Sequence, residues 1–266
     1  MSTSPRPRPA EPRLPDAPPS EAAWKVDAVT AIVHGSLERL LDVVPEVDDP
    51  LGAELLGSDV AGIWWAPGAE RDQGMRASEA LVARSYAAHL EQLGDDRALA
   101  ALRCLQAGAG GGWTDELAGA ATRLADRGRR EPPWWTAARE RRPAHGGELR
   151  WTVHGRELTL LLLQIADPYG GVTLVPIVDG GADGVIADIL LVTELDGLID
   201  YLAGHGQVGP SITWTSPARA AERTREAIAR TDLIGVAAPP PGSEREIGYV
   251  GLRGVLQRWT EAALAG

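Results

Sequence analysis

Three short aliphatic runs in the second half of the chain constrain its fold more than any other feature. They are residues 158–166, 172–178 and 185–192. Each has the length of a strand and is rich in β-branched or aliphatic residues, and turn sequences rich in Gly and Asp separate them. This pattern predicts an antiparallel β-meander of three to five strands, in which residues 150–154 and 211–215 are the two additional candidates.

The first of these runs predicts that both faces of the sheet are covered. From Leu158 to Ile165 both alternating faces are apolar except at Thr159 and Gln164, as in strands buried on two sides. We expect C-terminal helices to form one covering layer and the N-terminal helices to form the other. Pro176 would lie in a central strand although proline cannot donate a ladder hydrogen bond, which predicts either a bulge or a non-sequential strand order.

The rest of the chain is predicted to be helical after a proline-rich start. Residues 1–20 contain seven of the twenty prolines, which indicates a disordered tail. Residues 21–143 carry the periodicity of five or six helices, and residues 144–266 hold the sheet, further helices and an apolar stretch at 233–238 that predicts another strand. The predicted class is α+β: an N-terminal helical bundle packed on the meander, with C-terminal helices on its other face, in one cooperative unit.

Charge is distributed unevenly along the chain. The formal net charge is −11, and the 62 residues between Arg156 and Arg219 contain eight acidic residues and neither Lys nor Arg. Such a region is a poor surface for phosphate or nucleic acid and attracts basic partners. The predicted interaction surface, for a basic protein or for a second copy of the chain, consists of Asp183, Glu194, Asp196 and Asp200.

An arginine-rich connector with neighbouring tryptophans precedes the acidic region. Interleaved basic and aromatic residues occur in proteins that bind single-stranded nucleic acid. The candidate residues for such a surface are Arg139, Arg141, Arg142, Trp134 and Trp135. The acidic net charge favours another interpretation, in which the connector, residues 123–150, lies along the acidic sheet region and neutralises it. We therefore do not expect nucleic-acid binding.

The motifs of common enzyme classes fail their spacing tests. The chain has no G-x-S-x-G, C-x-x-C, H-E-x-x-H or Walker A sequence, and we expect no cofactor. His34 and Glu38 are one helical turn apart, but such pairs are usually solvated or packed, so we do not expect them to bind metal. The single cysteine, Cys104, lies in an apolar helical context and is predicted to fill space in the core.

One group of acidic residues could hold a metal ion. Asp167, Asp179 and Asp183 lie at predicted turns and Asp188 lies within an apolar strand, so the meander can bring some of them to the same end of the sheet. Carboxylates in such an arrangement bind Mg²⁺. In the competing interpretation Asp188 lies at a bulge or an edge, where it accepts hydrogen bonds from the backbone, and the turn acids face water.

Composition and hydropathy bear on the source and location of the chain. Phe and Asn are absent and Lys25 is the single lysine, which indicates a high-GC bacterial genome. We find no apolar leader at the N-terminus and no apolar run of membrane length. We therefore expect a cytoplasmic protein that does not contact a membrane.

The sheet region resembles one group of bacterial proteins. The residues that carry the resemblance are D-P-Y-G-G at 167–171, D-G-G-A-D-G-V-I-A-D at 179–188, and an arginine-containing helix that begins at Ser216 and Pro217. They are similar to an uncharacterised, actinobacterial-type group of proteins from high-GC bacteria. The resemblance implies that a helical half precedes a β-meander half; it carries no activity and assigns no residue a role.

Two functional hypotheses from different classes follow. The first is a non-catalytic binding or regulatory protein with an acidic docking surface on the sheet half. The alternative is a metal-dependent hydrolase or nuclease that uses the Asp cluster at the sheet turns. The failure of every catalytic motif and the long region without Lys or Arg favour the first hypothesis.

Overall fold

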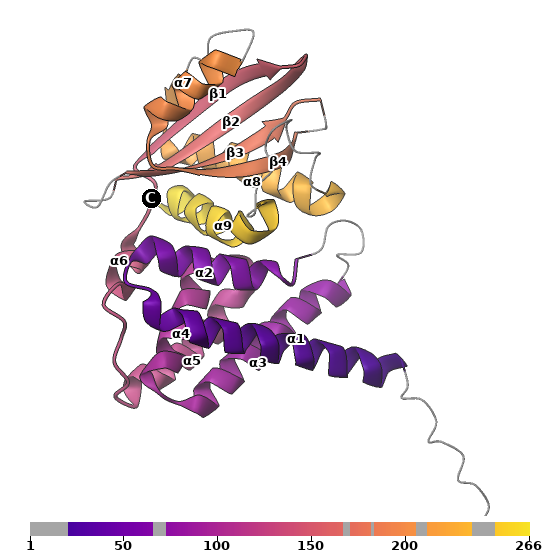
Figure 1. Cartoon of the computed structure of the whole chain (residues 1–266), viewed down its shortest axis with the longest axis vertical. Helices are drawn as coiled ribbons and strands as arrows, with labels where there is room; N and C mark the ends of the chain where they lie inside the picture. Colours follow the sequence, from indigo (N-terminus) through magenta and orange to yellow (C-terminus); the bar gives the residue numbers. More distant parts are fainter. Residues whose placement is uncertain (1–20, 66–72, 167–170, 182–183, 206–211, 236–247) are drawn as a thin grey trace, which may run out of the picture.

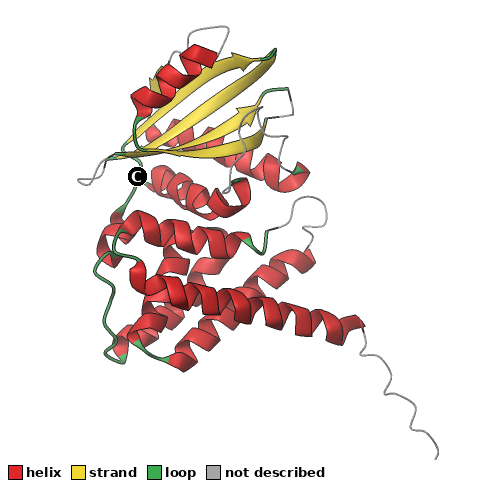
Figure 2. Ribbon diagram, in the orientation of Figure 1, coloured by secondary structure: helices red, strands yellow, loops and turns green. Residues whose placement is uncertain are grey.

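A helical half and a sheet half lie one above the other in the computed structural model (Figure 1). The structure describes residues 21–65, 73–166, 171–181, 184–205, 212–235 and 248–266. The predicted disordered tail, residues 1–20, lies outside these ranges. Figure 2 shows that the strands gather in one sheet at one end of the molecule, whereas the other end is built from helices alone.

Within the described residues, six α-helices precede the first strand. They are α1 (Glu21–Val43), α2 (Pro50–Gly62), α3 (Gln73–Leu93), α4 (Asp96–Gly108), α5 (Thr114–Asp126) and α6 (Trp135–Glu140). Local sequence explains their limits. Asp49 accepts hydrogen bonds from the first backbone N–H groups of α2, and Asp95 accepts one from Ala98 N at 2.7 Å. Gly94, with a φ of 65°, ends α3. Cys104 is buried in this core, and its burial raises the pKa of the thiol.

The sheet half is an antiparallel meander with three helices. Its elements are β1 (His145–Val153), β2 (Arg156–Ile165), β3 (Val172–Asp179), β4 (Val185–Val192), α7 (Leu195–His205), β5 (Ile212–Thr215), α8 (Pro217–Ile234) and α9 (Tyr249–Ala265). The strand order is β4-β3-β2-β1-β5, so β4 and β5 are the two edges. The predicted α+β class with a β-meander is confirmed, and both additional strand candidates are present.

Pro176 lies in a meander whose strand order is sequential. Of the two predictions, a bulge or a non-sequential order, the structure therefore shows the bulge. The β3–β4 register shifts between Ile177 and Val178, which makes a bulge on β4. On the other side, the β2–β3 pairing is interrupted between Leu160 and Leu163, at the level of Pro176. The interruption on the β2 side lies at the level of a residue that has no N–H to donate, and the bulge on the β4 side lies close to it.

The layers differ from the expected order. Leu161 and Leu163 share an apolar core with α8 and α9, whereas Leu160 and Leu162 share another with α7. All four leucines are buried, as predicted for a sheet covered on both faces. The helical half packs on α9 through α2 and does not cover the second face (Figure 1). That part of the prediction is wrong, because α7 follows β4 directly and covers the second face itself.

The additional strand predicted at residues 233–238 is also wrong where the structure describes it. Leu233 and Ile234 are the last residues of α8, and Gly235 ends the helix with a φ of 110°. Both apolar side chains are exposed, so they do not belong to a buried strand. Residues 236–238 lie outside the described part of the chain.

Candidate functional site: an acidic groove at the edge of the sheet

An open groove lies between the end of β4 and the helix that follows it. Two residues, Thr193 and Glu194, separate strand from helix, so α7 turns back beside the strand and over one face of the sheet. The groove has a volume of about 430 Å³. Its wall on the strand side is Leu190–Val192, and its other wall comes from Glu194, Gly197, Leu198 and Tyr201.

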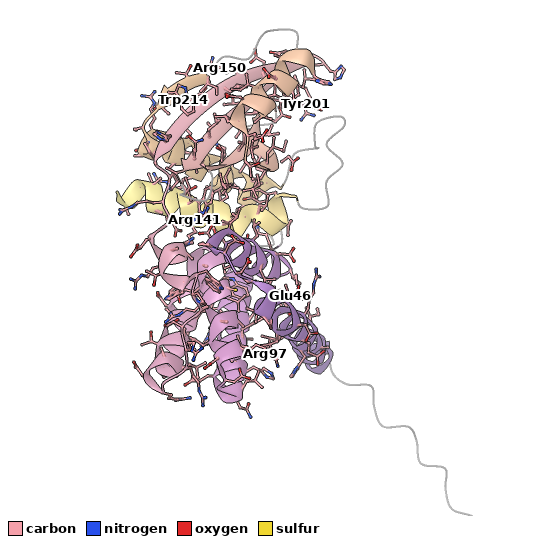
Figure 3. All side chains as sticks on the ribbon, turned by 60° about the vertical axis from the view of Figure 1, so that its left-hand side comes forward. Glu46, Arg97, Arg141, Arg150, Tyr201 and Trp214 are labelled. Atoms are coloured by element: carbon pink, nitrogen blue, oxygen red, sulfur yellow. The ribbon has the colours of Figure 1, made fainter. Side chains whose placement is uncertain are left out.

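The helical spacing of α7 divides its residues between core and groove. Positions 194, 197, 198 and 201 recur at one face of a helix, and these four line the groove. Leu202 is buried on the neighbouring face, against the sheet core. The Tyr201 side chain is 56% exposed, and its ring stacks on His205 with 4.3 Å between centroids. Tyr201 lies at the sheet end of the molecule (Figure 3).

Three exposed acids lie at the start of α7 and along it. They are Glu194, Asp196 and Asp200, which the sequence predicts as part of an interaction surface. Asp183, the fourth predicted residue, lies outside the described part of the chain. Because residues 157–218 contain no Lys or Arg, no basic side chain close in the sequence neutralises these acids. Glu194 lines the apolar groove, whereas the spacing of Asp196 and Asp200 places them on another face of α7.

The first half of the β4 edge is occupied by groups of this chain. Thr231 of α8 accepts a hydrogen bond from Ile186 N at 2.8 Å, and the Asp188 carboxylate accepts one from Ile189 N, also at 2.8 Å. A strand edge with free backbone groups is a template for another strand, and natural proteins usually cover it. The two N–H donors, of Ile186 and Ile189, precede Leu190–Val192, the residues of β4 that line the groove.

The metal candidates are held in structural roles where the structure describes them. Asp179 forms an ion pair with Arg156 and accepts a hydrogen bond from Gly181 N at 2.9 Å, which shapes the turn after β3. Asp188 is buried at the bulge of the edge strand, as in the competing interpretation. Within the described ranges no three His, Cys, Asp or Glu side chains could share a metal ion. Asp167 and Asp183 lie outside those ranges, so the metal hypothesis stays a prediction.

The surface predicted for single-stranded nucleic acid is not assembled. Trp134, Trp135 and Arg141 are buried, and Arg139 and Arg142 alone are exposed. The Arg103 guanidinium covers the Trp135 ring at 4.4 Å, on the side facing the helical core. The two tryptophans fill space in a chain that has no Phe, so the candidate surface is wrong.

The connector does not neutralise the acidic sheet region as expected. Arg123 and Arg127 pair with Glu91, and Arg141 donates to Glu54 at 3.1 Å; both acids belong to the helical half. The connector therefore neutralises acids of α2 and α3, and that interpretation is corrected. The acids of α7 are left facing solvent.

A buried charge cluster joins the two halves of the molecule. Glu54 of α2 is fully buried and accepts hydrogen bonds from Arg141, from Arg258 and from Trp259 Nε1 at 3.1 Å. Burial raises the pKa of Glu54 above its ordinary value, and the charges of Arg258 and Arg141 oppose the shift. Both carboxylate oxygens accept from donors of this chain, so the cluster stabilises the contact of α2 with α9.

A second cluster surrounds Asp232 at the end of α8. Its carboxylate accepts hydrogen bonds from Trp65 Nε1 at 2.9 Å, Tyr249 Oη at 3.1 Å and Arg253 Nε at 2.7 Å. Burial, together with the Asp232 charge, raises the pKa of Tyr249, so its hydroxyl stays a hydrogen-bond donor. This cluster joins the ends of α2 and α8 to the start of α9.

The two remaining sequence candidates do not form a metal site in the described structure. The ring of His34 meets that of His89 edge-to-face with 5.2 Å between centroids, which joins α1 to α3. Glu38 is exposed one turn along α1. This arrangement agrees with the prediction of a packed or solvated pair.

The sequence identified the exposed acids Glu194, Asp196 and Asp200, but not the apolar groove beside Glu194. Leu190 and Val192 were assigned to a covered strand, because the strand order that puts β4 at an edge was unknown. The spacing of Glu194, Leu198 and Tyr201 was the available signal, since it places an acid, an aliphatic and an aromatic side chain on one helix face.

Comparisons bring no further identification to this site. None of the helices in the described residues has the length and apolarity to cross a membrane. The chain matches no model of a known protein family, and no curated protein and no solved structure shows significant similarity to it.

Proposed function

We propose that this protein is a non-catalytic docking protein whose groove between β4 and α7 binds a basic, extended segment of a partner protein. The observation that carries the proposal is the combination of an open apolar groove lined by Glu194, two further exposed acids on α7, Asp196 and Asp200, and an adjoining strand edge. Each feature selects one property of the partner: side-chain polarity, charge and backbone conformation.

The negative charge of this surface favours a positively charged partner. Exposed acids in and beside a groove attract cationic segments and speed their encounter, whereas they repel nucleic acid and phosphate. Three arginines of the connector, Arg123, Arg127 and Arg141, are engaged with Glu91 and Glu54 in the helical half. A partner segment that carries Arg or Lys at its polar positions therefore complements Glu194 and the acids of α7.

The strand edge favours an extended partner over a helical one. An added strand makes main-chain hydrogen bonds with an edge strand and places alternate side chains in neighbouring pockets. Thr231 and Asp188 occupy the edge up to Ile189, so a partner strand has room beside Leu190–Val192. Its apolar side chains would meet Leu190 and Leu198, and a basic side chain would meet Glu194.

A labelled hexapeptide of alternating Arg and Val tests the proposal by fluorescence anisotropy. We expect it to bind, and a double charge reversal, Glu194→Lys with Asp196→Lys, to weaken binding by about tenfold or more. Glu226→Lys, at an exposed acid of α8, is the matched control and should bind as the wild type does. Raising the salt from about 50 mM to about 300 mM should weaken binding, because the Debye length shrinks.

Two further peptides separate strand pairing from simple charge attraction. A hexapeptide with N-methyl groups on alternate residues keeps every charge but loses the N–H donors of one edge, and we expect it to bind poorly. An acidic hexapeptide should not bind. Equal binding of the N-methylated and unmodified peptides, or of the wild type and the charge-reversed variant, would refute the docking site.

A second copy of the chain is the competing occupant. The first twenty residues supply three arginines, Arg6, Arg8 and Arg13, that could enter the same groove. Light scattering at rising protein concentration distinguishes the two cases. A concentration-dependent dimer that disappears when all three arginines are replaced by Ser in the full chain would assign the groove to self-association.

Metal-dependent hydrolysis is the alternative function, and the described residues supply no observation that favours it. It would be supported by a melting temperature that rises with Mg²⁺ or Mn²⁺. Loss of a metal-dependent hydrolytic activity in Asp188→Asn, with the fold intact, would overturn the docking proposal in its favour.

A further inference from the structure

A second cleft lies at the opposite edge of the sheet, between β5 and the start of α8. Its volume is about 250 Å³. The side chains that matter for its chemistry are Glu148, Leu161, Thr213, Thr215, Arg219 and Arg223. It is separate from the acidic groove, because β4 and β5 are the outermost strands on the two sides of the five-stranded sheet.

Two glycines of β1 explain how the walls of this cleft are held. A Cβ at Gly146 would be 2.7 Å from Ser216 O and 2.9 Å from Ala220 Cβ, so its absence lets the first turn of α8 approach the sheet closely. A Cβ at Gly147 would be 3.3 Å from the Trp214 ring, which therefore covers the other face of the sheet. Alternation then places Thr213 and Thr215 on the face that α8 covers.

The charges of the cleft are not balanced internally. Glu148 forms ion pairs with Arg223 and, at 3.3 Å, with Arg150, so both of its oxygens are engaged. Arg219, one turn before Arg223 on α8, has no carboxylate within ion-pair distance among the described residues. With two arginines and one glutamate in the lining, the cleft carries a net charge of plus one.

We propose that this cleft binds a small monocarboxylate with a short hydrocarbon body. The Arg219 guanidinium offers a planar fork that matches a carboxylate with two parallel hydrogen bonds. The hydroxyls of Thr213 and Thr215 supply further donors on the opposite wall. Leu161 and Ala220, both buried, form an apolar floor for the hydrocarbon part. This inference is independent of the docking groove.

Size and charge narrow the ligand class. Ligand pockets commonly measure about 300 to 1,000 Å³, so a cleft of about 250 Å³ fits a compact ligand. The Glu148 carboxylate in the wall repels a second negative charge, so a dianion such as a phosphate monoester is disfavoured against a monocarboxylate. A ligand with so few atoms is expected to bind in the millimolar range.

Benzoate is a suitable probe, with benzamide as its uncharged analogue and benzylphosphonate as a doubly charged one. Saturation-transfer difference NMR on the full chain, followed by titration, measures the binding of each. We expect benzoate to bind, benzamide to give no signal, and benzylphosphonate to bind more weakly than benzoate. A benzylphosphonate that binds more tightly than benzoate would overturn the monocarboxylate class.

Two arginine variants test the assignment of the site. Arg219→Met removes the charge but keeps the length of the side chain, and we expect it to weaken benzoate binding about tenfold. Arg225→Met, at an exposed position of the same helix outside the cleft, should leave it unchanged. Both changes lie on the surface, and matching melting temperatures confirm that the fold is intact. Absence of benzoate binding to the wild type, or equal binding to wild type and Arg219→Met, would refute the proposal.

Discussion

One face of the sheet is covered by α8 and α9, with the helical half beyond them, whereas the opposite face is covered by α7 alone. The first side is extensively packed. Helix α9 contacts the sheet on one side and α2 on the other, and buried ion pairs join the layers. The second side leaves acids, an aromatic ring and a groove exposed. Among the described residues, one face of the sheet is thus packed under several layers, whereas the side of α7 is more open.

The largest effect that would test this difference comes from the backbone contact between α2 and α4. A Cβ at Gly57 would overlap the carbonyl oxygen of Cys104, and the two helix backbones cannot separate without opening the helical core. We expect Gly57→Val to cost about 4 kcal/mol or more in the free energy of unfolding, measured by urea denaturation. Gly35→Val is the control, since a Cβ there meets nothing within 4 Å and should change stability by less than about 0.5 kcal/mol.

The buried carboxylate at the junction gives the next effect. Glu54→Gln replaces a carboxyl oxygen that accepts from Arg258 or Arg141 with an NH2 group that can only donate, so we expect a loss of about 3 to 5 kcal/mol in the free energy of unfolding. The pKa of Glu54 is raised in the folded state, so the wild type binds this proton more tightly when folded. The advantage of wild type over Glu54→Gln is therefore greatest below the ordinary carboxyl pKa of 4.5 and declines as the pH rises through the raised value.

Urea denaturation of both proteins from about pH 4 to pH 8 checks the sign of this linkage. The remaining titrating groups are common to the wild type and Glu54→Gln. Their contributions therefore cancel in the difference between the two free energies of unfolding. An advantage that grows with rising pH would show that Glu54 is held ionised by its arginines and that burial is the smaller effect.

The two faces can be compared directly at adjacent leucines of β2. Leu162 and Leu163 are both buried, but Leu162 packs under α7 and Leu163 under α8 and α9. Each change to Ala should cost about 2 to 5 kcal/mol, with the larger loss at Leu163. A cavity under α7 can shrink because the single helix can move inward. A cavity under α8 and α9 cannot shrink in this way, because these helices are packed on both sides. A larger loss at Leu162, in the same urea titration, would contradict the comparison.

The sequence was sufficient for the sheet because strands carry their own signal. Aliphatic runs separated by turn sequences predicted three strands and two further candidates, and all five are present. Pro176 predicted either a bulge or a non-sequential strand order, and the bulge is present. The pattern of Leu160–Leu163 also showed that both faces are covered. It could not show by which helices, because an apolar face packs equally well against any amphipathic helix. Layer order depends on α9, whose residues pack against both the sheet and α2.

The site was partly predictable for a similar reason. Exposed acids are visible as a region without Lys or Arg, and Glu194, Asp196 and Asp200 are exposed as expected. The burial of Trp134 and Trp135 could not be predicted from the sequence. Neighbouring arginine and tryptophan residues occur both in protein cores and on binding surfaces, so their pattern does not distinguish the two. Here Arg103 covers the Trp135 ring and pairs with Glu131. Long-range pairing of this kind is fixed by tertiary structure.

The smallest effect concerns the exposed face of α7, where stability and binding should change in opposite directions. Asp196 and Asp200 are both exposed and one helical turn apart, and like charges at this spacing destabilise a helix by about 0.2 to 0.5 kcal/mol. Asp200→Lys replaces the repulsion with an Asp–Lys attraction and moves a cation toward the end of the helix, where it is favourable. We therefore expect a rise of about 0.5 kcal/mol or slightly more in the free energy of unfolding, together with weaker binding of the Arg–Val hexapeptide. If Asp200→Lys instead lowered stability, the acid would be part of the structural framework, and the separation of a stabilising side from a binding side would not hold at α7.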